Sequence, residues 1–344
     1  MSFLSAVSSV GRGMRGACVG ALLLLGLSSP AGAYSQLVVF GDSLSDPGTF
    51  YANTGGAYPP DALYPGNRFS NGPVAAEYLA GLLGLAPSSV HNYAVGGAMT
   101  GTDNYAFHDP SAPPALQAIF ANSDLPGIST QMQRYWTNNV LADGGALYML
   151  WGGANDFNTF RASGNSDPAA AAAMIAEAVS NIAGMAASLL GHGAQHILIP
   201  NLPDLGLIPD STAGGPQEAA LYSALSMIYN QQLALALSTL DAQAPGVIVQ
   251  FDVSGFQHTV TDDPASWGFG NVSDPCLLTP SCLDGSINNV YWDGQHPTTY
   301  AHQLLAQGFY AAVAEVPEPA SLALVGLGLT GICVLRRRRE QAVG

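Results

Sequence analysis

The sequence predicts an α/β fold, a three-layer sandwich in which helices cover both faces of one parallel sheet. Short apolar segments rich in β-branched residues alternate with longer helical segments along the chain, which is the pattern of parallel strands joined by crossover helices. The carboxyl ends of parallel strands meet at one edge of a sheet, where ligands bind. Four residues follow expected strand ends and are therefore placed on that edge: Ser43, Gly97, Asn155 and Asp204.

Five segments are expected to form the strands. The segment 147–151 is a continuous apolar run, as expected for a strand that is buried on both faces, and 37–40 is apolar and ends before a glycine. In chain order the expected strands cover residues 37–40, 90–95, 147–151, 196–200 and 247–251. No internal repeat interrupts this order, so residues 34–315 are interpreted as one domain.

The helical segments have recognisable starts and ends. Asp167 followed by Pro168 is an N-cap with a proline at the first helical position, and Gly191 marks the end of that alanine-rich helix. Ser129 is expected to cap a helix that ends near residue 140. Further helices are expected at the end of segment 69–83 and over residues 216–242 and 297–313.

Charge excludes one class of partner. The chain has 344 residues, of which nine are basic and 24 acidic, and every basic residue is an arginine. Only Arg68, Arg134 and Arg161 lie between residues 34 and 316, against 22 acidic residues, so this part carries a formal net charge of −19. Such a field repels phosphate backbones. We therefore expect no nucleic-acid partner, and interpret the acidity as keeping an exported protein soluble.

Residues 1–33 have the features of a secretory signal peptide. Arg12 and Arg15 precede a short apolar stretch at 17–27, and Ala31-Gly32-Ala33 matches a small-residue cleavage site. The alternative is a buried N-terminal helix. The apolar run is shorter than the ~20 residues that span a bilayer, which favours a signal peptide and export.

Residues 316–344 carry a second targeting signal. Val-Pro-Glu-Pro at 316–319 precedes a nearly uncharged stretch at 320–335 and four arginines at 336–339. This is the pattern of a short transmembrane helix stopped by a positive cluster, and predicts a transient membrane association. It resembles the PEP-CTERM sorting signals of Gram-negative bacteria that make exopolysaccharide. The resemblance implies recognition and removal of the tail by an exosortase-type enzyme, and a location in the cell envelope or extracellular matrix.

Cysteine usage agrees with export. Between the two terminal segments only Cys276 and Cys282 remain, and in an oxidising compartment they are expected to form a small loop-closing disulfide, with two free buried thiols as the alternative. A metal site needs more ligands than this pair offers. His192 and His196 have the spacing of metal ligands on a helix, but glycines at 191 and 193 break the helix there. No metal site is expected.

Two distant segments supply the groups of a nucleophilic site. Ser43 follows the first expected strand in the run Gly-Asp-Ser-Leu at 41–44, and Asp293 and His296 lie three residues apart near the other end of the domain. A serine hydroxyl is a poor nucleophile until a base takes its proton. An imidazole suits that role, and a carboxylate can hold its tautomer and stabilise the imidazolium. We therefore expect Ser43, His296 and Asp293 to meet at the edge of the sheet.

A tetrahedral intermediate also needs hydrogen-bond donors for its oxyanion. Ser43 offers its own backbone N–H, and Asn155 offers a side-chain N–H. Gly97 lets a backbone N–H approach closely because it has no side chain, and the neighbouring Gly96 is the alternative donor. For the glycines, a tight turn without function is the competing interpretation.

These segments resemble the GDSL, or SGNH, family of lipases and esterases. Ser43, Gly97, Asn155 and His296 match the four named positions of the family in order, and the segments 68–72, 201–206 and 229–233 match as well. The resemblance covers residues 36–313 and implies a flavodoxin-like sandwich with five parallel strands in the order 2-1-3-4-5 and no metal or other cofactor. The chain lacks the Gly-x-Ser-x-Gly elbow of α/β-hydrolases, because position 45 is serine.

The leading hypothesis is an exported serine esterase or lipase that acts on carboxylic esters through an acyl-enzyme. One alternative is a carbohydrate esterase that deacetylates exopolysaccharide with the same residues, and another is a non-catalytic protein that binds the polysaccharide matrix. Asp46 and Asp156 are expected to orient loops by hydrogen bonds. Trp292 is interpreted as a core or rim residue, with a place in the acyl pocket as the alternative, and His302 as an exposed helix residue.

Overall fold

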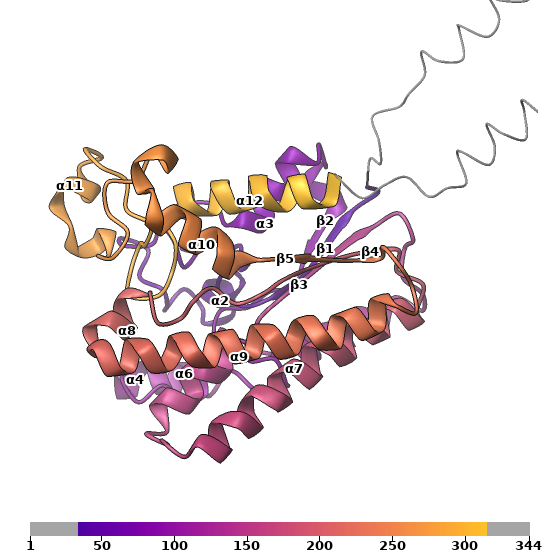
Figure 1. Cartoon of the computed structure of the whole chain (residues 1–344), viewed down its shortest axis with the longest axis horizontal. Coiled ribbons are helices and arrows are strands. Elements are labelled where there is room, and N and C mark those ends of the chain that lie inside the picture. Colours follow the sequence, from indigo (N-terminus) through magenta and orange to yellow (C-terminus); the bar gives the residue numbers. More distant parts are fainter. Residues whose placement is uncertain (1–33, 315–344) are drawn as a thin grey trace, which may run out of the picture. The chain divides into compact units, whose positions relative to one another are not determined.

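A computed structural model of the chain describes residues 34–314 (Figure 1). The expected signal peptide at 1–33 and the expected sorting segment at 316–344 lie outside the described residues, as does residue 315. The boundaries assigned to them therefore stay predictions.

A five-stranded parallel sheet forms the centre of the domain. Its strands are β1 (Leu37–Gly41), β2 (Val90–Asn92), β3 (Leu147–Trp151), β4 (His196–Pro200) and β5 (Ile248–Phe251). Their order is β2-β1-β3-β4-β5, and every neighbouring pair is parallel. This confirms the predicted α/β class and the strand order that the family resemblance implied.

Helices cover both faces of the sheet. In chain order they are α2 (Thr49–Asn53), α3 (Ala75–Leu82), α4 (Pro114–Phe120), α5 (Ile128–Asn138), α6 (Ala154–Ala162), α7 (Pro168–Gly191), α8 (Pro209–Ala213), α9 (Pro216–Asp241), α10 (Val253–Asp262), α11 (Pro280–Leu283) and α12 (Thr299–Ala314). Figure 1 shows α3 and α12 on one side of the sheet and the long pair α7 and α9 on the other. The three-layer arrangement is the one predicted.

The strand sequences explain the layers. Every residue of β1 and of β3 is buried, because both faces of a central parallel strand are covered. Alternate side chains belong to opposite cores: Leu37 and Val39 pack with α3 and α12, whereas Val38 and Phe40 pack with α5, α7 and α9. Strand β2 ends earlier than predicted, although the backbone N–H groups of Tyr93 and Val95 still donate to β1.

The helix starts test two predicted caps. At α7 the Asp167 carboxylate accepts a hydrogen bond from the Ala169 N–H, which confirms the cap and the proline start. At α5 the prediction was wrong, because the helix begins at Ile128 and its N-cap is Gly127. The backbone carbonyls of the preceding loop 99–101 accept the first helical N–H groups, including that of Ser129, so no serine cap is needed.

Within residues 34–314, one helix is long and apolar enough to cross a membrane by length and composition, namely α7. Its buried face includes Ile175, Ile182 and Leu189, which belong to the core beneath the sheet beside α9. In this domain α7 is a core helix.

Candidate active site

A tight turn at the end of β1 presents Ser43. The Ser45 N–H donates to the Asp42 carbonyl at 3.0 Å, and the Asp42 carboxylate accepts the Leu44 N–H at 3.0 Å. The strand must end in glycine, because a Cβ on Gly41 would lie 2.9 Å from the carbonyl oxygen of Trp151 on neighbouring β3. The Ser43 hydroxyl thus stands on a rigid support at the carboxyl edge of the sheet.

The structure brings Ser43, His296 and Asp293 together. The Nε2 atom of His296 lies 2.9 Å from the Ser43 Oγ, across 253 positions of sequence. On the other side of the ring, Nδ1 lies 2.8 and 2.9 Å from the two carboxylate oxygens of Asp293. This places a base next to the hydroxyl and a carboxylate next to the base, which is the geometry of an activated serine.

The pKa shifts of His296 and Asp293 suit a proton shuttle. Burial acts to lower the pKa of His296, but the charge and hydrogen bond of Asp293 outweigh it and hold the pKa above its ordinary value. Burial acts to raise the pKa of Asp293, while His296 and two backbone N–H groups outweigh it and lower the pKa. Asp293 is therefore ionised at neutral pH and favours the imidazolium that forms when serine gives up its proton.

One partner of Asp293 was missed at the sequence level. The Tyr64 hydroxyl donates to Asp293 Oδ2 at 2.8 Å. Tyr64 follows a proline-rich segment, and its position is set by long-range contacts, among them the bond from the Trp292 Nε1 to the Leu63 carbonyl at 3.1 Å. No local pattern in the sequence predicts such a contact.

The three residues that are expected to supply donors for an oxyanion, Ser43, Gly97 and Asn155, line one cavity together with His296. Within residues 34–314 no protein acceptor takes the Ser43 or the Gly97 N–H. The N–H of Gly96, in contrast, donates to Asp46 Oδ2 at 2.7 Å. Gly97, at φ +73°, is therefore the glycine of the pair whose N–H is free for a ligand.

Asn155 is held at the start of α6. Its Nδ2 donates to the Ala98 carbonyl at 3.2 Å, and its Oδ1 accepts from the Asn158 amide at 3.3 Å. One of the two Nδ2 hydrogens remains for an oxyanion. Asn158 also donates to Gln295, whose amide donates in turn to Asp210 at 2.9 Å. This series of hydrogen bonds links α6 to the segment that carries His296. In the sequence, only the i, i+3 spacing of Asn155 and Asn158 indicates that these two side chains could meet.

Three buried carboxyls frame the turns around Ser43. Asp46 accepts backbone N–H groups from the start of α2 and from Gly96, and Asp156 accepts the N–H and hydroxyl of Thr100. Both orient loops, as predicted. Asp42 was given no role at the sequence level, yet burial raises its pKa to about 7 and its Oδ2 has no hydrogen-bond partner in the described chain.

Two cavities meet at the Ser43–His296 pair. One has a volume of about 90 Å³ and a wall that is mostly apolar, including Leu205, Phe256 and Leu305. The other has a volume of about 330 Å³ and a wall of aromatic rings and carboxylates. Trp292 lines neither; it is buried against Tyr64 and Cys276, so it is a core residue.

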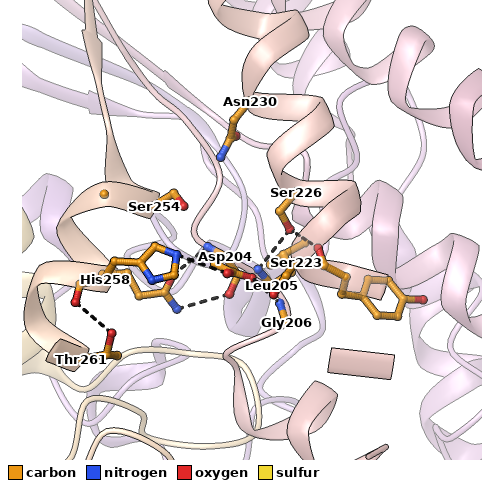
Figure 2. Close-up of polar contacts among 12 residues, drawn as sticks. Asp204, Leu205, Gly206, Ser223, Ser226, Asn230, Ser254, His258 and Thr261 are labelled. Atoms are coloured by element: carbon orange, nitrogen blue, oxygen red, sulfur yellow. Dashed lines mark hydrogen bonds and ion pairs between the residues drawn. The ribbon is translucent and has the colours of Figure 1, made fainter. Parts of the chain in front are cut away.

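Asp204 does not join this site. Figure 2 shows it between Ser223 and His258, where its Oδ1 accepts the Ser223 hydroxyl at 2.6 Å and its Oδ2 lies 3.3 Å from the His258 Nε2. The same Oδ1 accepts the Gly206 N–H at 2.9 Å. Asp204 thus ties the loop after β4 to α9 and α10, although it follows a strand end as predicted.

Two cysteines and three histidines have other surroundings. Cys276 and Cys282 are joined by a disulfide. His192 stacks on Trp136, and His196 packs edge-on against Tyr34, so the two rings have separate aromatic neighbours. His302 was predicted to be exposed, and this was wrong. It is fully buried, because α12 packs its His302 face against the start of α3.

Comparisons with known proteins identify the family of this chain. The sequence model of the family described as GDSL-like Lipase/Acylhydrolase matches residues 37–309, and that of the PEP-CTERM protein-sorting motif matches residues 315–339. Phosphatidylcholine-sterol acyltransferase of Aeromonas hydrophila is 31% identical over 245 residues, which cover 71% of this chain and 66% of the relative. Esterase EstA of Pseudomonas aeruginosa is 29% identical over 346 residues, which cover 85% of this chain and 49% of the relative.

Among solved structures, a lipolytic protein of the G-D-S-L family from Veillonella parvula superposes with a TM-score of 0.39 at 13% identity, covering 81% of this chain and 98% of that one. The chain spans between 48% and 66% of the length of the first curated relatives that it matches. The family match covers most of the domain and contains Ser43, Asn155 and His296. The chain therefore belongs to the GDSL-like lipase/acylhydrolase family and carries a PEP-CTERM protein-sorting motif at its C-terminal end.

Proposed function

We propose that this protein is an exported serine esterase or lipase that hydrolyses carboxylic esters through an acyl-enzyme. The observation that carries the proposal is the contact of Ser43 Oγ with His296 Nε2 at 2.9 Å, backed by Asp293 on the far side of the ring. The relatives named as an esterase and an acyltransferase support the reaction class, because both names describe chemistry on acyl groups.

The geometry supports a two-step route. The Ser43 oxygen attacks the ester carbonyl carbon while His296 Nε2 takes the hydroxyl proton, and the carbonyl oxygen becomes an oxyanion facing the N–H groups of Ser43, Gly97 and Asn155. The C–O bond to the alcohol then breaks, and His296 returns the proton to the leaving oxygen. Water repeats the sequence on the acyl-serine, which releases the acid and restores the hydroxyl.

Replacement of the nucleophile tests the proposal directly. Ser43→Ala in the full-length chain is expected to abolish turnover of p-nitrophenyl butyrate, because no other hydroxyl lies within reach of His296 Nε2 among the described residues. Ser45→Ala is the matched control, since Ser45 lies in the same turn with its buried hydroxyl unpaired in the described chain. Wild-type activity in the Ser43 variant would refute the assignment.

The oxyanion donors form a separate part of the proposal. Asn155→Ala is expected to lower kcat by on the order of 10²–10³, the usual effect of removing one such donor. Thr159→Ala is the control, because Thr159 lies in the next turn of α6, contacts the Met99 sulfur and lines neither cavity at Ser43. A negligible loss in Asn155→Ala would remove that side chain from the oxyanion hole.

The competing function, a non-catalytic protein that binds the polysaccharide matrix, is separated from the enzyme by covalent labelling. A fluorophosphonate reacts with a serine that a neighbouring base activates, so an esterase is modified at Ser43 and a binder is not. The second enzymatic candidate, a carbohydrate esterase, would place its sugar in the larger of the two cavities at Ser43. Comparing rates on acetylated sugars with rates on p-nitrophenyl esters of increasing acyl length distinguishes it from a lipase.

The sorting motif implies an exported protein that is directed to the cell surface. We propose further that the signal peptide is removed after Ala33 and that an exosortase-type enzyme removes the tail. Mass spectrometry of the protein isolated from the cell envelope measures both ends of the mature chain. A mature protein that retains residues 320–335 would contradict processing of the tail.

A further inference from the structure

The two cavities at Ser43 divide an ester into two halves. Both are lined by the Ser43 and His296 side chains and by the polar trio Asn155, Asn158 and Gln295, so they join at the reacting atoms. An ester extends in two directions from its carbonyl carbon, one through the acyl group and one through the alcohol oxygen. The apolar cavity of about 90 Å³ suits the acyl chain, which leaves the cavity of about 330 Å³ for the alcohol.

The alcohol cavity has an aromatic wall. Phe50 packs edge-on against both Tyr58 and Phe69, with ring centroids 6.1 and 5.5 Å apart, and Phe120 closes the group at 5.5 Å from Phe50. These rings come from three separate segments and form one apolar cluster beside the site. The face of an aromatic ring carries partial negative charge and attracts a cation.

The same cavity is lined by carboxylates and by no arginine or lysine among the described residues, so His296 of the site is its one titratable base. Asp293 is engaged by His296, but Asp109 and Asp210 receive hydrogen bonds only from neutral groups, namely Ser111, Tyr105 and Gln295. Each of the three arginines within residues 34–314 is paired with a carboxylate elsewhere: Arg68 with Glu77, Arg134 with Asp124 and Arg161 with Glu218. A negatively charged alcohol would find no counter-charge here.

The potential inside the cavity is accordingly negative. Burial and then the charges of Asp293 and Asp109 raise the pKa of Tyr58. Burial and Asp109 raise the pKa of Tyr105 to about 12, even though Arg161 opposes the shift. Carboxylates disfavour a phenolate for the same reason that they would disfavour any anion placed in this space.

We propose that the alcohol cavity selects esters of cationic alcohols, in particular quaternary or primary ammonium alcohols, over uncharged alcohols of the same shape, and rejects anionic ones. The ammonium group lies against the rings of Phe50, Tyr58 and Phe69, with Asp109 and Asp210 as its counter-charges. This inference rests on the proposed ester hydrolysis at Ser43.

A matched pair of substrates tests it on the full-length protein. Butyrylcholine and 3,3-dimethylbutyl butyrate share the acyl chain and the shape of the alcohol and differ in one positive charge. We expect kcat/KM to be on the order of tenfold higher for the choline ester at low salt, the size of a cation–π contact assisted by carboxylates. The ratio should fall between about 0.01 M and about 0.5 M salt, because salt screens charges.

Asp109→Asn should lower the ratio several-fold, since it removes charge while the amide oxygen still accepts from Ser111. Asp103→Asn is the matched control, because Asp103 lies in the same loop, pairs with His108 and does not line the cavity. In the unmodified protein, tetramethylammonium should inhibit competitively and neopentyl alcohol should inhibit less.

Equal kcat/KM for the two esters with unchanged turnover of p-nitrophenyl butyrate would overturn the inference alone. No turnover of any of the three esters would overturn the proposed hydrolysis, and the inference with it.

Discussion

Asp293 accepts hydrogen bonds from four donor groups, and together they fix the imidazole that faces Ser43. The backbone N–H groups of Gln295 and His296 donate to its Oδ1 at 2.8 Å, the His296 ring lies against both oxygens, and Tyr64 donates to Oδ2. The loop that carries the base is therefore shaped by the carboxylate that orients it. At the scale of single residues, the site is a set of mutually supporting hydrogen bonds rather than three independent side chains.

Tyr64→Phe tests whether that fourth bond matters. Without the hydroxyl, Asp293 loses a donor that stabilises its charge and its position, and we expect kcat/KM to fall roughly tenfold, as for loss of a hydrogen bond to a charged group. The carboxylate also becomes more basic, so the acid limb of the pH profile should move to higher pH. Tyr58→Phe is the control, because Tyr58 lines the same cavity without contacting Asp293 through a hydrogen bond. An unchanged pH profile would assign Tyr64 a structural role alone.

The raised pKa of His296 predicts where activity is lost in acid. The base must be neutral to accept the Ser43 proton, so kcat/KM should fall as the pH drops through a pKa that lies above 6.5, the ordinary value of histidine. In Asp293→Asn the charge that raises this pKa is gone, so the limb should move to lower pH while kcat drops. A wild-type acid limb with its midpoint below pH 6.5 would contradict the effect of Asp293 on the pKa of His296.

At the scale of elements, the seam between α3 and α12 depends on a buried histidine. His302 on α12 accepts a hydrogen bond through Nδ1 from the N–H of Ala75 at 3.3 Å, the first residue of α3. A helix start has N–H groups without helical partners, and the imidazole satisfies one of them across the seam. Burial, with the nearby charge of His296, lowers the pKa of His302 to about 3.

This buried imidazole makes the domain sensitive to acid. Between about pH 6.5 and the lowered pKa, the unfolded chain binds a proton at His302 and the folded chain does not, so stability decreases as the pH falls. When the pH is lowered from 6.5 to 4.5, the free energy of unfolding of the wild type should fall by about 2 kcal/mol more than that of His302→Asn. In this variant the amide oxygen accepts the hydrogen bond from Ala75 and does not titrate. Urea unfolding at the two pH values measures the difference. Equal losses in the two proteins would show that His302 is protonated in the folded state.

The disulfide loop is a second element that supports the site from outside. The Cys276 and Leu277 N–H groups donate to the carbonyls of Tyr291 and Trp292, directly before Asp293. Replacing both cysteines by alanine should lower the free energy of unfolding by about 2 kcal/mol, as expected for opening a loop of this size, and should also lower kcat/KM. A reductant should lower the stability and kcat/KM of the wild type and leave both unchanged in the variant. A variant with wild-type stability and activity would show that the disulfide contributes to neither.

At the scale of the whole molecule, the sequence was informative where chemistry or periodicity is local. Strands β3 and β4 have the predicted bounds, because each is a continuous apolar segment, and Ser43 and His296 lie in short motifs that follow a strand or precede a helix. Residues whose role depends on distant contacts were missed or misplaced. Tyr64 is positioned by the Trp292 segment, and His302 is buried only because α3 covers that side of a helix that is apolar on several sides.

The choice between Gly96 and Gly97 shows the same limit. Both positions are glycine, and nothing in the sequence separates them. The separation comes from Asp46, which lies fifty positions earlier in the chain and takes the Gly96 N–H. Folding brings that carboxylate to the turn, and the neighbouring N–H is left for a ligand.

The central claim, that a serine at the end of β1 forms a covalent acyl intermediate, is tested most directly by trapping that intermediate. The full-length protein is mixed with p-nitrophenyl butyrate, quenched in acid within the first turnover, digested and analysed by mass spectrometry. We predict a butyryl group on the peptide that contains Ser43, at near-stoichiometric occupancy, and no adduct in Ser43→Ala. Steady turnover with no acylated peptide at any quench time, or an adduct on another residue, would contradict the account.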